Sequence, residues 1–250
     1  MGTATEMTST NRADRTLGVR HALLVYTTPV ALFSRVEDTG AYGWALATLL
    51  VLVVILGYAE MQTGLIDRGV DQQTEAALAK LEESQGHLVD RIELRDRMDD
   101  IRKTSEFNKL LARLGVVVFT PMYLLASCLL IASILYALVA LTGRKPEYHT
   151  LMSICVYSSF IILAGHIVRF AMIMYYRTTD VDTSLEMLVA PGTRSPLSAI
   201  DPFRVWFWVL VAMGLVVTRQ LGRRMAIVSC VLLGLLAAGA RVAMVYGMKS

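Results

Sequence analysis

LGVVVFTPMYLLASCLLIASILYALVAL, residues 114–141, runs for 28 positions without a charged side chain. A helix needs about 20 apolar residues to cross the hydrocarbon core of a bilayer, so this stretch predicts a membrane span. The other apolar runs are residues 44–58, 151–174, 203–218 and 225–246. The first of them reaches spanning length only with its flanks. The pattern predicts an all-α, polytopic membrane bundle with five transmembrane helices.

Composition restricts what else the chain can be. Hydrophobic residues fill 55% of its 250 positions, which leaves no room for a second soluble domain of independent size. The net charge of +3 arises from basic residues spread over the tail, the turns and the insert. A nucleic-acid interface would gather them in one patch. We expect the lipid bilayer as the immediate partner, and no nucleic acid.

Sequence patterns that carry chemistry were not found. Cys128, Cys155 and Cys230 fall inside apolar runs without CxxC spacing, and the four histidines are scattered along the chain. There is no zinc-protease, serine-hydrolase, P-loop or dinucleotide-binding pattern. We expect a protein that is not an enzyme, with no catalytic residues, metal site or cofactor.

The region before the first span divides into two parts. Residues 1–16 are polar and lack the apolar core of a signal peptide, so they are expected to form a disordered tail ahead of a membrane domain over residues 17–250. Residues 17–43 include TTPVALFSRV, which has the pattern of a short amphipathic helix. This segment could lie on the cytoplasmic leaflet or pack under the bundle, and both interpretations remain open.

Residues 61–113 form a charged insert between the first two spans. It has eleven acidic and nine basic residues and no proline, a composition that favours helix. Gly86 can end one helix, which predicts helices over 62–85 and 88–113. They could form an extracytoplasmic hairpin or lie flat on the membrane. Apolar residues near the tip of a hairpin form a predicted partner surface: Leu78, Leu81, Leu88 and Ile92. A solvated spacer is the competing interpretation.

Basic turns predict the orientation of the spans. Arg144 and Lys145 follow the second span, and Arg219, Arg223 and Arg224 follow the fourth. The positive-inside tendency puts both turns and the N-terminus in the cytoplasm and the C-terminus outside. The basic residues of the insert do not fit a plain count, but long charge-mixed loops carry less weight in this tendency.

Charged residues at the outer ends of the spans need partners in lipid. The candidates for an outer-leaflet polar cluster are Glu60, His166, Arg169, Asp201 and Arg241. Such a cluster could bind a lipid headgroup or a substrate, or its charges could only snorkel or lock helices together. Asp201 followed by Pro202 also predicts the start of a helix. A helix-packing stripe recurs every four residues: Ala226, Cys230, Gly234 and Ala238.

Three segments carry a resemblance to a known family: TTPVALFSRV at 27–36, KPEYHTLMSICVYSSFIILAG at 145–165 and IDPFRVWFWVLVAMGL at 200–215. In their order and spacing they resemble the Yip1 family of membrane proteins. The resemblance implies a five-span bundle with a cytoplasmic N-terminus and no catalytic residues. Eukaryotic relatives have a longer cytoplasmic N-terminal region and associate with Rab-type GTPases; that region is short in this chain, so the resemblance does not extend to GTPase binding. The charged insert is similar to that of bacterial members, some of which accompany ABC-type exporters and help them to assemble. The resemblance thus implies that this chain lies in a bacterial cytoplasmic (inner) membrane.

We therefore expect a non-enzymatic scaffold or accessory subunit that helps to assemble another membrane complex, such as an ABC-type exporter. The alternative is a transporter or channel for a lipid or small molecule that uses the outer polar cluster. A homo-oligomer is compatible with either expectation.

Overall fold

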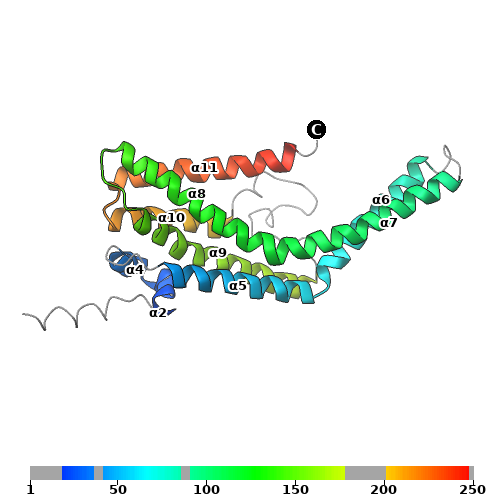
Figure 1. Cartoon of the computed structure of the whole chain (residues 1–250), viewed down its shortest axis with the longest axis horizontal. Helices are drawn as coiled ribbons and strands as arrows, with labels where there is room; N and C mark the ends of the chain where they lie inside the picture. The colour runs from blue at the N-terminus through cyan, green and yellow to red at the C-terminus, as the bar shows by residue number, and fades with distance from the viewer. Residues whose placement is uncertain (1–18, 37–41, 86–90, 178–200, 248–250) are drawn as a thin grey trace, which may run out of the picture. The chain divides into compact units, whose positions relative to one another are not determined.

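The computed structural model describes residues 19–36, 42–85, 91–177 and 201–247. Within these ranges all regular elements are helical, which confirms the predicted all-α class (Figure 1). The elements are α2 Val19–Ala22, α3 Leu24–Thr27, α4 Pro29–Val36, α5 Gly43–Gln62, α6 Leu65–Gln85, α7 Arg91–Leu114, the π-helix η1 Gly115–Phe119, α8 Thr120–Leu141, α9 Tyr148–Tyr176, α10 Pro202–Val217 and α11 Arg223–Gly247. The tail predicted over residues 1–16 lies outside the described residues.

Four helices are long and apolar enough to cross a membrane. They are α5, α9, residues 223–243 of α11, and one continuous helix over 92–141 that runs through η1 into α8. α10 is also apolar but has only 16 residues. At 1.5 Å per residue it is about 24 Å long, less than the ~30 Å hydrocarbon core. Local thinning of the bilayer would accommodate such a short helix.

The described chain divides into two compact units. The bundle unit takes its residues from 1–51, 124–168 and 182–250, and the hairpin unit takes its residues from 52–123 and 169–181. Because these boundaries fall within α5, α8 and α9, each of these helices contributes a segment to both units.

α9 forms the core of the bundle unit. Every residue from 150 to 161 is buried, including several with hydroxyl groups. Ser153 Oγ donates to the His149 carbonyl and Ser159 Oγ to the Cys155 carbonyl, each at 2.8 Å. These two bonds within the helix satisfy hydroxyls that would otherwise be costly to bury. Among the described residues, Tyr157 Oη and Ser158 Oγ are buried without a hydrogen-bond partner.

Glycines set the contact between α9 and α10. A Cβ added at Gly214 would lie 2.6 Å from Ile154 Cγ2, and one added at Gly165 would lie 2.9 Å from the Phe203 ring. Lipid provides no hydrophobic driving force between helices, so close van der Waals packing at small residues has to hold them together. These two glycines allow the close approach.

The amphipathic segment before the first span packs against the bundle. Leu32, Phe33 and Val36 of α4 are fully buried, and α4 lies against α10. Tyr26 Oη donates to the Phe160 carbonyl at 2.5 Å and ties α3 to α9. The structure thus shows the packing of this segment on the bundle. Contact of the same segment with the cytoplasmic leaflet stays a prediction.

The two basic turns lie at the same end of the bundle unit. Arg144 Nη1 donates to the Arg219 carbonyl at 2.8 Å, and the Glu147 amide donates to Gln220 Oε1 at 3.3 Å. The α8–α9 and α10–α11 connections therefore contact each other directly.

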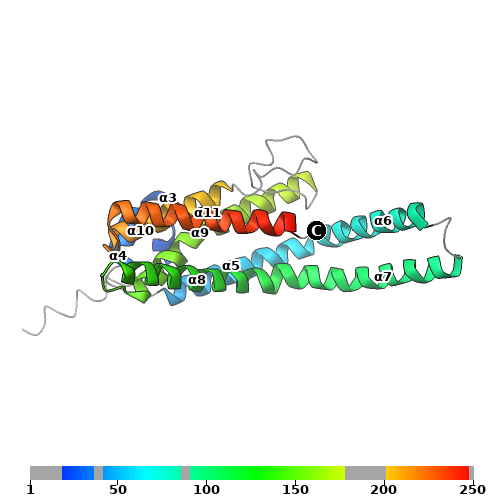
Figure 2. The same cartoon turned by 90° about the horizontal axis from the view of Figure 1, so that it is seen from above.

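In the hairpin unit, α6 and α7 run antiparallel and side by side in both views (Figures 1 and 2). The insert is thus a helical hairpin. Its helices differ from the predicted ranges 62–85 and 88–113, because α5 continues to Gln62 and a turn at Thr63 and Gly64 precedes α6. The sequence pattern did not predict this break. Gly64 has φ +66°, a left-handed conformation that glycine adopts without steric cost. Gly86 lies outside the described residues.

The helix from α7 into α8 adapts to Pro121 by a π-turn. The backbone N–H of Thr120 donates to the Gly115 carbonyl, and Thr120 Oγ1 donates to the same oxygen at 3.1 Å. A proline has no N–H to continue the ladder, and a π-turn is one way for a helix to accommodate it. A Cβ added at Gly57 would lie 2.8 Å from the Val116 carbonyl oxygen, so α5 passes close to this turn.

We predict that Gly214→Ala lowers the thermal stability of the detergent-solubilised chain. The added methyl would overlap Ile154, and overpacking of this kind costs about 1–3 kcal/mol. Gly239→Ala is the matched control, since a Cβ at Gly239 meets nothing within 4 Å. The control should be neutral or slightly stabilising because alanine favours helix. Equal melting temperatures for the two variants would contradict the close α9–α10 contact.

Candidate functional site

The five residues of the predicted polar cluster fall in different units. Glu60 and Arg169 belong to the hairpin unit, whereas His166, Asp201 and Arg241 belong to the bundle unit. Among the described residues Arg169 Nε is buried without a hydrogen-bond partner, and no ion pair joins Arg169 to Glu60. His166 is half-buried on α9. The complete five-residue cluster therefore stays a prediction.

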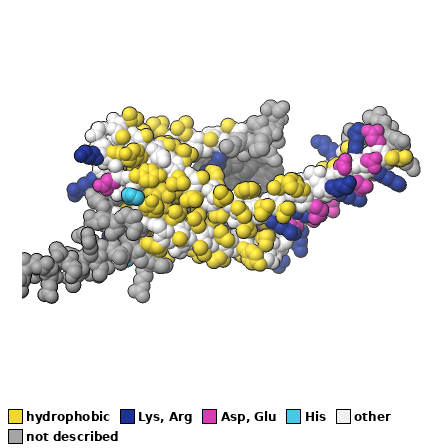
Figure 3. Space-filling model, viewed as in Figure 1, with side chains coloured by type: hydrophobic (Ala, Val, Ile, Leu, Met, Phe, Trp, Pro, Cys, Tyr) yellow, Lys and Arg dark blue, Asp and Glu magenta, His cyan; other side chains and the backbone are white. Residues whose placement is uncertain are grey.

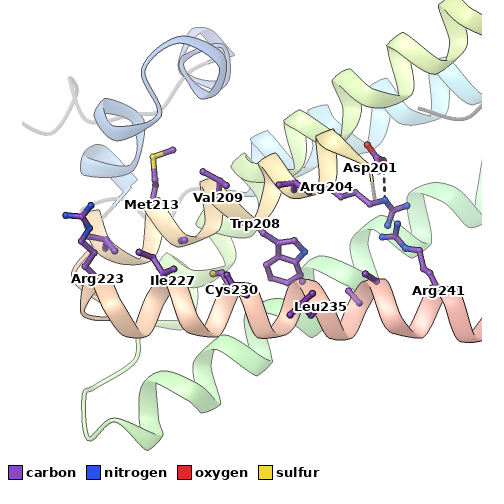
Figure 4. A pocket seen from close by; sticks show the side chains of 17 residues that line it. Asp201, Arg204, Trp208, Val209, Met213, Arg223, Ile227, Cys230, Leu235 and Arg241 are labelled. Atoms are coloured by element: carbon purple, nitrogen blue, oxygen red, sulfur yellow. Dashed lines mark ion pairs between the residues drawn. The ribbon is translucent and has the colours of Figure 1, made fainter. Parts of the chain in front are cut away.

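Asp201 and Arg241 do meet at one site, together with an arginine that the sequence analysis passed over. Asp201 caps α10 as predicted, since its Oδ1 accepts from the Phe203 amide at 2.9 Å. Its Oδ2 lies 3.5 Å from Nε of Arg204, one turn along α10. Arg204 and Arg241 extend toward each other from α10 and α11 (Figure 4). Two guanidinium groups thus face one carboxylate.

These charged groups border a cavity of about 650 Å³ between α10 and α11, which we call the α10–α11 groove. Its walls are almost entirely apolar. The exceptions are Asp201, Arg204 and Arg241 at one end and Arg223 at the opposite end (Figure 4). The apolar lining includes Trp208, Val209, Met213, Ile227, Val231 and Leu235.

The predicted helix-packing stripe forms much of the α11 side of this groove. Ala226 and Cys230 are buried, and a Cβ at Gly234 would lie 3.1 Å from Trp208 Cδ1. Cys230, Gly234 and Ala238 all line the groove. Small residues let α10 approach at Gly234, but they also leave space beside Trp208. The stripe therefore contributes to both helix packing and a cavity.

In the hairpin unit, half-buried apolar residues form a seam between α6 and α7. On α6 they include Leu78 and Leu81. On α7, Leu94, Met98 and Ile101 are half-buried and Ser105 is buried. A spacing of three and four residues keeps them on one side of the helix. Leu78 and Leu81, predicted as part of a partner surface, are thus partly buried in the seam of the hairpin.

Nearer the spans the seam becomes polar. Arg113 Nε and Nη2 donate to Asp67 at 3.0 and 2.6 Å, and Lys109 Nζ lies 2.8 Å from Asp71 Oδ1. Thr74 Oγ1 donates to Ser105 Oγ at 2.8 Å. Figure 3 shows charged side chains gathered on the hairpin helices and hydrophobic ones over the bundle helices. Ion pairs thus join α6 to α7 where the sequence has few apolar residues.

These ion pairs shift the pKa values of their members. The hydrogen bonds from Arg113 lower the pKa of Asp67 below its usual value. Hydrogen bonds to Asp71 and Glu106 raise the pKa of Lys109. The stability gained from Asp67 is present above the unfolded-state pKa of about 4 and is lost as pH falls through the lower folded value. The stability gained from Lys109 is lost only at strongly alkaline pH.

The side of α7 away from α6 carries an apolar surface that the sequence analysis did not identify. We call Phe107, Leu110, Leu111 and Leu114 the outer face of α7; they are between 41% and 58% exposed. At 3.6 residues per turn they lie opposite Ser105 and Ala112 of the seam. Ile92, from the predicted partner surface, is 69% exposed farther along α7. Leu88 lies outside the described residues.

The described residues contain no group of three or more His, Cys, Asp or Glu that could hold a metal ion. Two surfaces of the described chain are candidates for a functional site, the α10–α11 groove and the outer face of α7.

We predict that the α6–α7 hairpin opens in acid. Amide protection factors, corrected for the intrinsic pH dependence of exchange, should be constant around neutral pH and fall below about pH 4 as Asp67 is protonated. Asp67→Asn should lower protection at pH 7 and remove the acid step. Asp99→Asn is the control, because Asp99 pairs only within α7 and both partners are exposed. If both variants behave alike, the Asp67–Arg113 pair does not hold the hairpin.

Comparison with known proteins agrees with this architecture. The model of the Yip1 domain matches residues 23–243, which include α3 to α10 and most of α11. Neither a search of curated proteins nor a search of solved structures found a match. Because the matched region covers far more than half of the chain, and its apolar helices suit a bilayer, the protein belongs to the Yip1 family of integral membrane proteins.

Proposed function

We propose that this chain is a non-enzymatic scaffold or accessory subunit that binds another membrane protein through its α6–α7 hairpin. The observation that carries the proposal is the outer face of α7, where four large apolar side chains remain exposed and three of them, Phe107, Leu110 and Leu111, precede the apolar run 114–141. Exposed apolar patches of this kind often mark protein or membrane contact sites.

The hairpin does not need this face for its own stability. Its seam contains Leu78, Leu81, Met98 and Ile101, and two cross-helix ion pairs support the end near the spans. The outer face of α7 is thus available for a further contact. It follows the helix-in-groove pattern of i, i+3, i+4 and i+7 anchors, with Phe107 as the first residue.

The position of the face along the chain suggests the class of partner. Leu114 directly precedes η1, so the face continues from the apolar span into the charged hairpin. A partner that packs there would itself be a membrane protein with a helix close to the bilayer surface. The resemblance to bacterial Yip1 proteins makes a subunit of an ABC-type exporter in the cytoplasmic membrane the partner we propose.

The orientation that we propose has the N-terminus in the cytoplasm and the hairpin and C-terminus outside. The contact between Arg144 and the Arg219 carbonyl supports it, since both basic turns then lie on the positive, cytoplasmic side.

A site-specific photocrosslinker tests the proposal. Placed at Phe107 or Leu111 in the full chain, it should form a covalent product with a subunit of a membrane export complex in native membranes. Placed at Asn108, an exposed polar position on the same turn, it should not. Phe107→Ser with Leu111→Ser should abolish co-purification in mild detergent, whereas Asn108→Ala should preserve it.

Two results would overturn the scaffold proposal. One is crosslinking to lipid alone from both Phe107 and Leu111, which would make the outer face of α7 an interfacial surface. The other is unchanged co-purification of the partner with the double serine variant. Protection of the hairpin amides would verify in each case that the variant is folded.

The second candidate function is a transporter or channel for a lipid or small molecule. The specific observation in its favour is the α10–α11 groove with its charged end. Loss of vesicle transport on replacing Arg241, with partner binding retained, would favour this candidate over the scaffold.

A further inference from the structure

We propose that the α10–α11 groove binds one anionic phospholipid, with its phosphate between Arg204 and Arg241 and an acyl chain along Trp208 and the small-residue stripe of α11. The proposal is independent of the scaffold function, because it concerns only residues of the bundle unit.

The charge at one end of the groove favours an anion. Asp201 carries one negative charge. Its Oδ2 pairs with Nε of Arg204 at 3.5 Å, and its Oδ1 caps α10. No described acidic side chain pairs with Arg241, and the two guanidinium groups point toward each other (Figure 4). Two cations that point toward each other repel, and an anion between them offsets this repulsion. A phosphate satisfies both, because guanidinium groups bind phosphate oxygens through paired hydrogen bonds.

The walls of the groove suit a hydrocarbon chain. Between the charged ends the lining is apolar, and Trp208 and Leu235 border its middle. From Arg223 to Arg241 the α11 backbone rises about 27 Å, close to the ~30 Å thickness of the hydrocarbon core. An acyl chain in this groove would thus run parallel to the lipids around it, with its headgroup at the Arg241 end.

The volume of the groove suits a small ligand. At about 650 Å³ it lies within the range of small-molecule sites.

Quenching of tryptophan fluorescence by brominated lipid provides the test. One full-length variant keeps Trp208 as its only tryptophan through Trp44→Phe and Trp206→Phe. The control keeps Trp206, which is exposed on α10 and does not line the groove, through Trp44→Phe and Trp208→Phe. Both are reconstituted in phosphatidylcholine vesicles that contain increasing fractions of brominated phosphatidylglycerol.

Trp208 should be quenched at a lower fraction of brominated phosphatidylglycerol than Trp206, which should follow the bulk composition. In the Trp208-only chain, Arg241→Gln should raise the fraction required about fivefold, as expected for one arginine near an anionic headgroup. Arg224→Gln, an exposed position on the same helix outside the groove, should have no effect. Ala238→Leu should remove the excess quenching without changing any charge.

Three outcomes would overturn the proposal. The quenching of Trp208 could follow the bulk lipid composition, as that of Trp206 does, which would mean that the groove has no preference for anionic lipid. Excess quenching could survive both Arg241→Gln and Ala238→Leu. Trp208 could also be shielded from brominated phosphatidylcholine and phosphatidylglycerol alike, which would indicate a protein cover. The comparison of Trp208 with Trp206 uses no groove-charge variant, so it decides the question even if Arg241→Gln fails to fold.

Discussion

Lipid as solvent is the constraint on which the bundle unit depends. Apolar side chains gain little by leaving lipid for protein, so helices stay together only where their surfaces fit closely. Gly165 and Gly214 provide that fit between α9 and α10. Of the buried hydroxyls of α9, Ser153 and Ser159 donate to carbonyls of their own helix, which lowers the cost of burying them among apolar neighbours. Among the described residues, Tyr157 Oη and Ser158 Oγ are buried without a hydrogen-bond partner.

Water imposes a different requirement on the α6–α7 hairpin. There the helices are charged, and a seam of leucine, methionine and isoleucine side chains joins them, supplemented by the pairs of Asp67 with Arg113 and Asp71 with Lys109. Surface ion pairs are individually weak, so the seam and the pairs act together. The apolar residues left over on the outer face of α7 therefore call for a functional explanation, and binding of a membrane partner supplies one.

The α10–α11 groove shows how one sequence feature can serve two purposes. Small residues every four positions on α11 let Trp208 of α10 come close at Gly234, and the same small residues leave a hollow beside it. A bilayer would fill that hollow with hydrocarbon. The arginines at its end give the hollow a preference for a negatively charged headgroup.

The sequence by itself determined the helical class, the apolar runs, the start of α10 at Asp201 and Pro202, and the family, because hydrophobic length and capping are local properties of the chain. Only the tertiary structure decided which faces meet. The pairing of Arg204 with Asp201 beside Arg241, and the choice of Leu78 and Leu81 for the seam while Phe107 and Leu111 stay exposed, depend on the register between helices. Register is fixed by contacts between residues distant in sequence, and the periodicity of a single helix carries no information about it.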